Sequence, residues 1–174
     1  METPIRVVIA DDNADMRRIE RMMISRAEGF EIVGEAEDGV QLLKDVSFIV
    51  TKGQKIALVG SNEQAQTALF RILAEEIKPD SGSFKWGVTI STNYFPKDNS
   101  EYFDGHDETL VDWLRQFSEK KDDVYLRGFL GRMLFSGDDV FKPVKVLSGG
   151  EKVRCMLSRM MLSGANVLML DQPN

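Results

Sequence analysis

The stretch LSGGEKVRCMLSRMML, residues 147–162, and the NVLMLD that follows at 166–171 decide the fold class. Ser148 and the two glycines after it predict a helix start, because a serine hydroxyl can cap the first turn of a helix. The apolar side of this predicted helix carries Val153, Met156, Leu157, Met160 and Met161. A short apolar strand ending at Asp171 comes next, so the stretch is typical of an α/β protein.

The first forty residues repeat this mixture of strand and helix. Ile5–Ala10 is a short apolar run rich in β-branched residues, and Phe30–Ala36 is a second β-prone run. Between them, apolar residues recur at helical spacing from Met16 to Ala27, behind Asn13, which is a good helix cap. Two strands joined by one helix predict a parallel, right-handed βαβ unit.

Further elements follow from residue 44 to the end of the chain. Gln54–Gly60 is predicted to be a strand, Ala65–Ile77 a helix and Thr89–Phe95 another strand. Residues 105–147 contain two amphipathic segments, TLVDWLRQF and DVYLRGFLGRMLF, which predict a small helical arm. We expect Trp113 to pack in the core of this arm.

The composition argues against several classes of function. A net charge of −6 and a pI near 4.9 disfavour nucleic-acid binding, since such surfaces need clustered Lys and Arg. No apolar run approaches the roughly 20 residues of a membrane span, and the start lacks the pattern of a signal peptide. Cys155 is the single cysteine, which fits a reduced, cytoplasmic setting. We therefore expect no nucleic-acid partner and no membrane.

Residues 4–43 carry a first family resemblance. IRVVIADDN, a helix and FEIVGEAEDGVQLL resemble the opening third of a response-regulator receiver domain. The resemblance implies that Asp11 and Asp12 bind Mg²⁺, and neighbouring carboxylates suit a hard cation. The alternative is a solvated acidic loop at a helix N-terminus, where negative charge is favourable. No carboxylate ends the next predicted strand, at Gly60, so receiver phosphotransfer would lack its acceptor.

Residues 44–174 carry a second resemblance. LSGGE, the helix after it and NVLMLD resemble the signature and Walker B motifs of an ABC ATPase, most closely the ABC-F type associated with ribosomes. The resemblance implies ATP and Mg²⁺ as cofactors. It also implies that Ser148, Gly149 and Gly150 contact the γ-phosphate held by a second protomer, and hence a homodimer. The alternative is that these residues only cap an amphipathic helix.

The expected phosphate loop departs from the pattern of that family. The general pattern is G-x-x-x-x-G-K-[ST], in which backbone N–H groups cradle phosphates and the lysine neutralises them. The candidate nucleotide-binding residues of this loop are Gly60, Asn62, Gln66 and Thr67, although Gln66 stands at the lysine position. Gln172 stands where the family has a catalytic glutamate, and an amide cannot act as a base.

These departures predict the loss of function. We expect an engineered chimeric scaffold with no enzymatic activity and no required cofactor, in which Glu75 replaces a family glycine and raises helix propensity. The alternative is a weak ATP- or phosphate-binding protein, with Thr67 and Asp171 as Mg²⁺ positions. The predicted fold is an α/β flavodoxin-like and P-loop hybrid, with a mostly parallel sheet, helices on both faces and the helical arm. The domains 1–44 and 45–174 are expected to form one folded unit, with Val167–Leu170 in the same sheet as the N-terminal strands.

Overall fold

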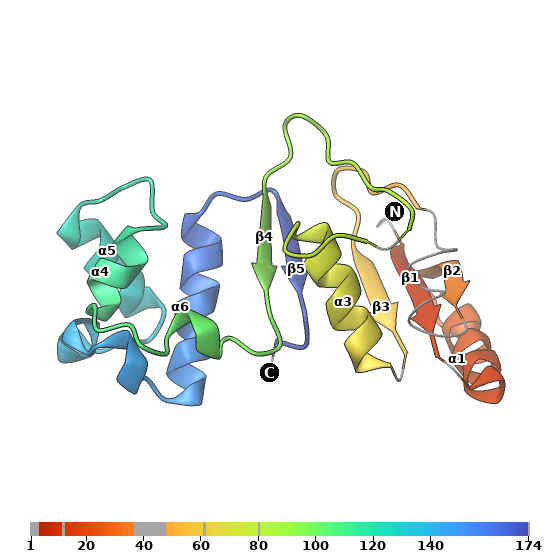
Figure 1. The fold of residues 1–174 in the computed structure, drawn as a ribbon, viewed down its shortest axis with the longest axis horizontal. Helices are drawn as coiled ribbons and strands as arrows, with labels where there is room; N and C mark the ends of the chain where they lie inside the picture. Colours follow the sequence, from red (N-terminus) through yellow and green to blue (C-terminus); the bar gives the residue numbers. More distant parts are fainter. Residues whose placement is uncertain (1–3, 12, 37–47, 61, 80, 174) are drawn as a thin grey trace. The chain divides into compact units, whose positions relative to one another are not determined.

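The computed structural model describes residues 4–11, 13–36, 48–60, 62–79 and 81–173. The chain forms two compact units, residues 1–85 and 86–174 (Figure 1). The expected boundary at residue 44 lies outside the described residues, and the two expected domains stay a prediction. The α/β class with parallel strands is confirmed in both units.

The first unit is built on a three-stranded parallel sheet. β1 (Ile5–Ala10) lies in the middle, between β2 (Phe30–Ala36) and β3 (Ile56–Val59). Strand β1 pairs in parallel with both neighbours, and its residues from Val7 to Ala10 are almost completely buried. A strand enclosed in this way needs apolar side chains on both faces, as its sequence has. The predicted parallel pairing of the two N-terminal strands is confirmed.

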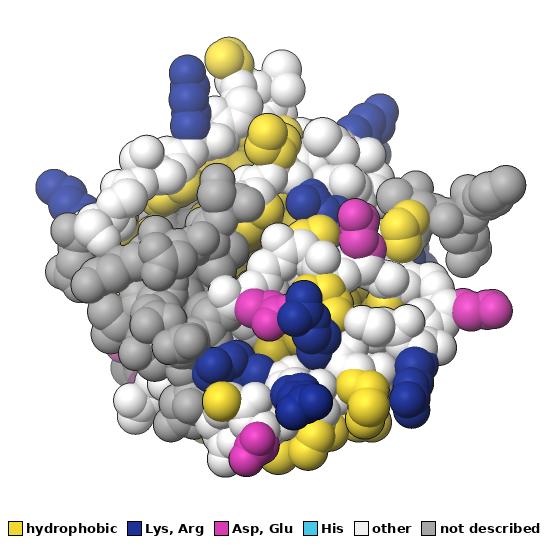
Figure 2. Space-filling model, turned by 90° about the vertical axis from the view of Figure 1, so that its right-hand side faces the viewer, with side chains coloured by type: hydrophobic (Ala, Val, Ile, Leu, Met, Phe, Trp, Pro, Cys, Tyr) yellow, Lys and Arg dark blue, Asp and Glu magenta, His cyan; other side chains and the backbone are white. Residues whose placement is uncertain are grey.

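Helix α1 (Ala14–Arg26) connects β1 to β2. Asn13 caps it as expected, because its side chain accepts hydrogen bonds from the N–H groups of Asp15 and Met16. None of its residues is buried. The large apolar residues exposed on and after this helix are Met16, Ile19, Met22, Met23 and Phe30. Figure 2 shows the side of the molecule where α1 lies, with hydrophobic side chains interspersed among basic ones.

Helix α3 (Glu63–Leu73) follows β3 after a short loop. Ala65 on α3 packs in a small core with Val8 and Ala10 of β1. The helix ends at Leu73, and Glu75 has a φ of +64°. The expectation that Glu75 favours the helix is therefore wrong, because the left-handed region disfavours any side chain with a Cβ and favours glycine.

The second unit has its own two-stranded parallel sheet. β4 (Thr92–Phe95) pairs with β5 (Val167–Leu170) in register from Thr92 opposite Val167. Asn166 aligns the strand starts, since its N–H donates to the Ser91 carbonyl and its side chain accepts from the Ser91 N–H. The expectation that β5 extends the N-terminal sheet is therefore wrong. An apolar strand pattern predicts burial but not the partner strand, and here the long-range contacts between Asn166 and Ser91 accompany the pairing of β5 with β4.

The helices of the second unit enclose its main core. They are α4 (Leu110–Arg115), α5 (Asp123–Arg132), α6 (Gly149–Leu162) and the short 3₁₀ helices η1 (Ser100–Tyr102), η2 (Gly137–Phe141) and η3 (Val144–Val146). Trp113 is buried in this core, as expected, and so is Cys155. In the described part of the chain, no helix is long and apolar enough to cross a membrane.

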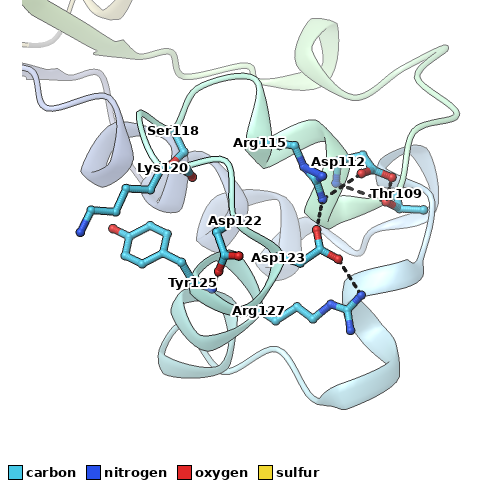
Figure 3. Close-up of polar contacts among 9 residues, drawn as sticks. All are labelled: Thr109, Asp112, Arg115, Ser118, Lys120, Asp122, Asp123, Tyr125 and Arg127. Carbon is cyan, nitrogen blue, oxygen red and sulfur yellow. Dashed lines mark hydrogen bonds and ion pairs between the residues drawn. The ribbon is translucent and has the colours of Figure 1, made fainter.

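Ion pairs connect α4 to α5 at the surface (Figure 3). Arg115 contacts the carboxylates of Asp112, at 3.2 Å, and Asp123. The second carboxylate oxygen of Asp123 accepts from Arg127, one turn further along α5, at 2.9 Å. These side chains are substantially exposed, so each pair adds little stability.

Candidate phosphate-binding site

The expected phosphate loop lies between β3 and α3. It begins at Gly60, where the neighbouring backbone leaves no room for a side chain. A Cβ added to Gly60 would lie 1.5 Å from the carbonyl oxygen of Ala10. The end of β1 therefore passes directly against the first residue of the loop. Only glycine fits at such a close approach of two backbones.

Gln66, at the lysine position, is buried in the first turn of α3. Its Nε2 donates a hydrogen bond to the carbonyl oxygen of Gly60 at 2.8 Å. The side chain of Asn62 accepts from the N–H of Ala65 at 3.0 Å and so caps the helix. The loop is therefore held closed by two neutral amide side chains, and the helix N-terminus behind it favours a bound anion.

Thr67 and Asp11 lie in the same unit as this loop. Thr67 is half-buried in α3, one residue after Gln66. Asp11 is buried at the end of β1, where its Oδ1 accepts from the N–H of Asn13 at 2.8 Å. Burial, followed by the negative charge of Asp11, raises the pKa of Glu20. Within the described ranges, no group of three or more His, Cys, Asp and Glu side chains could hold a metal ion, and Asp12 lies outside those ranges.

The signature residues form a complete cap on α6. The Ser148 hydroxyl donates to the Glu151 carboxylate at 2.6 Å, and the same carboxylate accepts from the Ser148 N–H at 2.8 Å. The Glu151 N–H donates to the Ser148 hydroxyl at 3.4 Å. These hydrogen bonds from Ser148 hold the pKa of Glu151 below its usual value. Gly149 and Gly150 are exposed, so the first turn of α6 is accessible to a ligand.

Asp171 lies at the end of β5, almost completely buried. Its N–H donates to the carbonyl of Phe95, and its Oδ2 accepts from the Tyr94 hydroxyl at 3.2 Å. Sequence reasoning missed Tyr94, because only the pairing of β4 with β5 brings the two residues together. Gln172 follows with a φ of +47°, an unusual backbone conformation for a residue with a Cβ.

The candidate residues are divided between the two units. Gly60, Asn62, Gln66 and Thr67 belong to the first, and the signature residues belong to the second together with Asp171. The structure brings Gln66 into contact with Gly60, and it brings Ser148 into contact with Glu151. The candidate residues therefore form separate groups, namely a phosphate loop in the first unit and, in the second unit, an exposed start of α6 and a buried aspartate at the end of β5.

A phosphate loop before a helix, with a signature helix and an aspartate-ended strand, defines an ABC-type nucleotide-binding domain. Residues 43–174 match the family model described as ABC transporter, and the chain belongs to this family. It is 64% identical over 137 residues to the uncharacterized ABC transporter ATP-binding protein YkpA of Bacillus subtilis, a match that covers 78% of this chain and 25% of that protein.

Two other comparisons agree. The chain is 33% identical over 139 residues to the energy-dependent translational throttle protein EttA of Haemophilus influenzae, covering 76% of this chain and 24% of that protein. A solved structure named RNase-L Inhibitor is similar in fold, with a TM-score of 0.51 and 24% identity, over 66% of this chain and 22% of the other. The chain thus spans about a quarter of the length of the curated relatives it matches.

These comparisons correct two expectations. A chain 64% identical to an ABC ATP-binding protein over most of its length points to a native ABC ATPase, so the expected engineered scaffold is wrong. The expectation of no enzymatic activity is contradicted by the same family membership. Gln66 and Gln172 are two single positions within this long match, and they do not outweigh it.

Proposed function

We propose that this chain is part of an ABC nucleotide-binding domain that binds and hydrolyses ATP, with the phosphates at the loop from Gly60 to Thr67. The observation that carries the proposal is the family match over residues 43–174, which includes this loop, the signature and the Walker B strand. The loop geometry supports it, since Gly60 permits close backbone approach and the start of α3 favours an anion.

Magnesium is the metal that such a site would take. The Thr67 hydroxyl in the first unit and the Asp171 carboxylate in the second unit each offer oxygen, which is the ligand atom that Mg²⁺ prefers. Bound Mg²⁺ would neutralise phosphate charge, which matters here because Gln66 contributes none. The Tyr94 hydroxyl orients the Asp171 carboxylate, and the Phe95 carbonyl fixes its backbone. Gln172 can orient a water molecule through its amide, but it cannot accept the proton of that water.

A second copy of the chain is the partner that the signature surface fits. The exposed first turn of α6 can donate N–H groups to a phosphate held by another protomer. In that state the Ser148 hydroxyl would exchange its bond to Glu151 for one to the phosphate. We therefore propose ATP-dependent homodimerisation through Ser148, Gly149 and Gly150.

The receiver-like segment and the cellular setting belong to the same proposal. The parallel βαβ arrangement of residues 5–36 supports a receiver-like N-terminal piece, with Asp11 and Asp12 as its Mg²⁺ ligands.

The similarity to a translational throttle protein supports a role in translation, and hence a cytoplasmic location with the ribosome as partner. Co-sedimentation of the purified chain with ribosomes, in the presence and absence of MgATP, tests that role; absence of co-sedimentation in both cases contradicts it.

Thermal unfolding with ATP, ADP and Mg²⁺ tests nucleotide binding. A ligand at one hundred times its Kd stabilises the folded state by about 2.7 kcal/mol, so Tm must rise with MgATP concentration. Thr67→Val keeps the shape of the side chain but removes the hydroxyl, and it should abolish the part of the shift that depends on Mg²⁺. An unchanged Tm at several millimolar MgATP contradicts the proposal.

Phosphate release tests hydrolysis separately. Gln172→Glu supplies the missing base and should raise kcat roughly 10²-fold or more, because general-base catalysis contributes about 10²–10⁴. Gln172→Leu has a similar size without hydrogen-bonding groups, and should be slower than the unchanged chain. If all three release phosphate at the rate of buffer, the hydrolytic part of the proposal is wrong.

A further inference from the structure

Two basic side chains on one face of α6 stack on aromatic rings, in addition to Arg154, which lies over Phe135 at 5.1 Å. Lys152 Nζ lies 5.5 Å from the ring centre of Phe103, and the Arg159 guanidinium lies 4.6 Å from Tyr102 and 4.8 Å from Phe117. Seven residues are about two helical turns, so Lys152 and Arg159 project from the same face of α6. Cation–π contacts therefore hold this face of α6 at two positions, about two helical turns apart.

The rings that receive these cations form a rigid cluster, which we define as Tyr102, Phe103, Trp113 and Phe117. Trp113 stacks on Phe103 with ring centres 5.3 Å apart, and meets Phe117 edge-on at 4.8 Å. Its indole N–H donates to the Tyr102 carbonyl at 3.1 Å. The cluster thus joins η1 to α4 and offers α6 a fixed surface.

Arg159 depends on these rings to an unusual degree. Its Nε and Nη1 atoms are buried and have no hydrogen-bond partner in the described part of the chain. A buried cation is costly unless its charge is compensated, and here the two ring faces provide the compensation. The contact therefore contributes to the rotational setting of α6 together with its buried residues, because another rotation would leave the guanidinium without either ring.

The segment that carries Tyr102 and Phe103 begins beside Asp171. The Phe95 carbonyl, at the end of β4, accepts the hydrogen bond from the Asp171 N–H. Residues 96–101 connect Phe95 to the aromatic cluster. Just after that cluster's first two rings, Asp104 forms an ion pair with Lys152 of α6 at 3.3 Å. One short chain segment thus runs from the buried aspartate to the face of the signature helix.

We propose that Lys152 and Arg159 are positioning residues that lock α6 to residues 96–104, and thereby set where Ser148, Gly149 and Gly150 lie relative to Asp171. The inference deepens the proposed function and rests on it for its role in catalysis. A displacement of segment 96–104 is passed to the signature turn, because a hydrogen-bonded helix rotates as one body.

Amide hydrogen exchange on the whole chain without nucleotide tests the lock. Arg159→Met keeps the length of the stem and removes the cation, and should accelerate exchange in residues 100–104 and 149–155 by about tenfold, whereas α5 changes less than twofold. Arg159→Lys should restore most of the protection. Arg132→Met is the matched control, since Arg132 stacks on Phe129 at 5.5 Å within α5, away from α6. It should leave both segments unchanged.

The contrary results are equally specific. Uniform acceleration through residues 86–173, or unchanged exchange in 149–155, would overturn the proposal. If Arg159→Met does not fold, Lys152→Met, at the periphery of the cluster, must give the same local pattern. In a second arm, Arg159→Met should weaken MgATP-dependent self-association about tenfold while MgATP binding stays within twofold. If the unchanged chain does not bind MgATP, only the proposed function is rejected. The hydrogen-exchange pattern would still show whether Lys152 and Arg159 hold α6 against residues 96–104.

Discussion

Gln66 donates a hydrogen bond from Nε2 to the carbonyl oxygen of Gly60, at 2.8 Å, across the loop that is proposed to bind phosphate. A lysine at this position would bring a positive charge to the same place. The amide instead closes the loop onto its own backbone. Gly60 and Gln66, the first and seventh residues of the loop, are thus joined by a hydrogen bond between two uncharged groups.

Gln66→Lys should raise the affinity for MgATP by roughly ten- to a hundredfold, since hydrogen bonds to charged groups contribute about 1.5–3 kcal/mol. Isothermal titration calorimetry on both proteins measures the change. Gln66→Met is the control, because it fills the same space without charge and should not increase the affinity. Equal Kd values for the lysine and methionine variants would contradict a phosphate position beside residue 66.

Gly60→Ala should destabilise the first unit by more than about 3 kcal/mol, because the new Cβ would overlap the Ala10 carbonyl and force β1 and β3 apart. Chemical denaturation followed by circular dichroism measures the loss. Gly128→Ala is the control in an open helical position, where nothing lies within 4 Å, and should stabilise α5 by about 0.5–1 kcal/mol. Similar effects of both substitutions would be inconsistent with the close approach.

The sequence predicted the positions of the strands and helices better than it predicted which strands pair with one another. The ends of β1 and β2 and the cap at Asn13 follow from local apolar runs and local hydrogen-bonding groups, and the structure has them where expected. The pairing of β5 with β4 depends on contacts between residues 75 positions apart, such as Asn166 with Ser91, and no local pattern contains them. For the same reason the Tyr94 contact to Asp171 could not be foreseen.

The candidate site shows the same limit. The cap at Ser148 was predicted from the serine and the two glycines after it, whereas the structure adds Glu151 as its reciprocal partner within one helical turn. The bond from Gln66 to Gly60 was not predicted, since it depends on how the loop closes against β1. Chemical reasoning about single substitutions then suggested a loss of activity that the family match contradicts.

Glu75→Gly should stabilise the first unit by about 1 kcal/mol, since residue 75 has a φ of +64° and a left-handed conformation costs a side chain roughly 1–2 kcal/mol. Thermal unfolding measures the gain. Ala74→Gly is the neighbouring control, at a φ of −78°, and should lower stability instead. A loss of stability in both variants would mean that the helix continues through residue 75.

Ser148→Ala should raise the pKa of Glu151 toward its usual value, because Ser148 provides the hydrogen bonds that lower it. Because the pKa of Glu151 is lowered in the folded state, the cap contributes its full stability at a pH above the ordinary carboxyl pKa. This stability is lost as the pH falls through the pKa that Glu151 has in the folded protein. The variant should therefore lose about 1 kcal/mol at neutral pH and less in acid. Carboxyl titration by NMR gives the pKa, and Ser163→Ala, at the other end of α6, should leave it unchanged.

Amide chemical-shift mapping of the whole chain with MgATP tests nucleotide binding at the loop most directly. We expect saturable shifts concentrated at residues 60–67, with Gly60, Asn62 and Gln66 among the largest, and weaker shifts with ADP. Unchanged resonances in this loop at 10 mM MgATP, on the order of a hundred times a submillimolar Kd, would contradict this expectation.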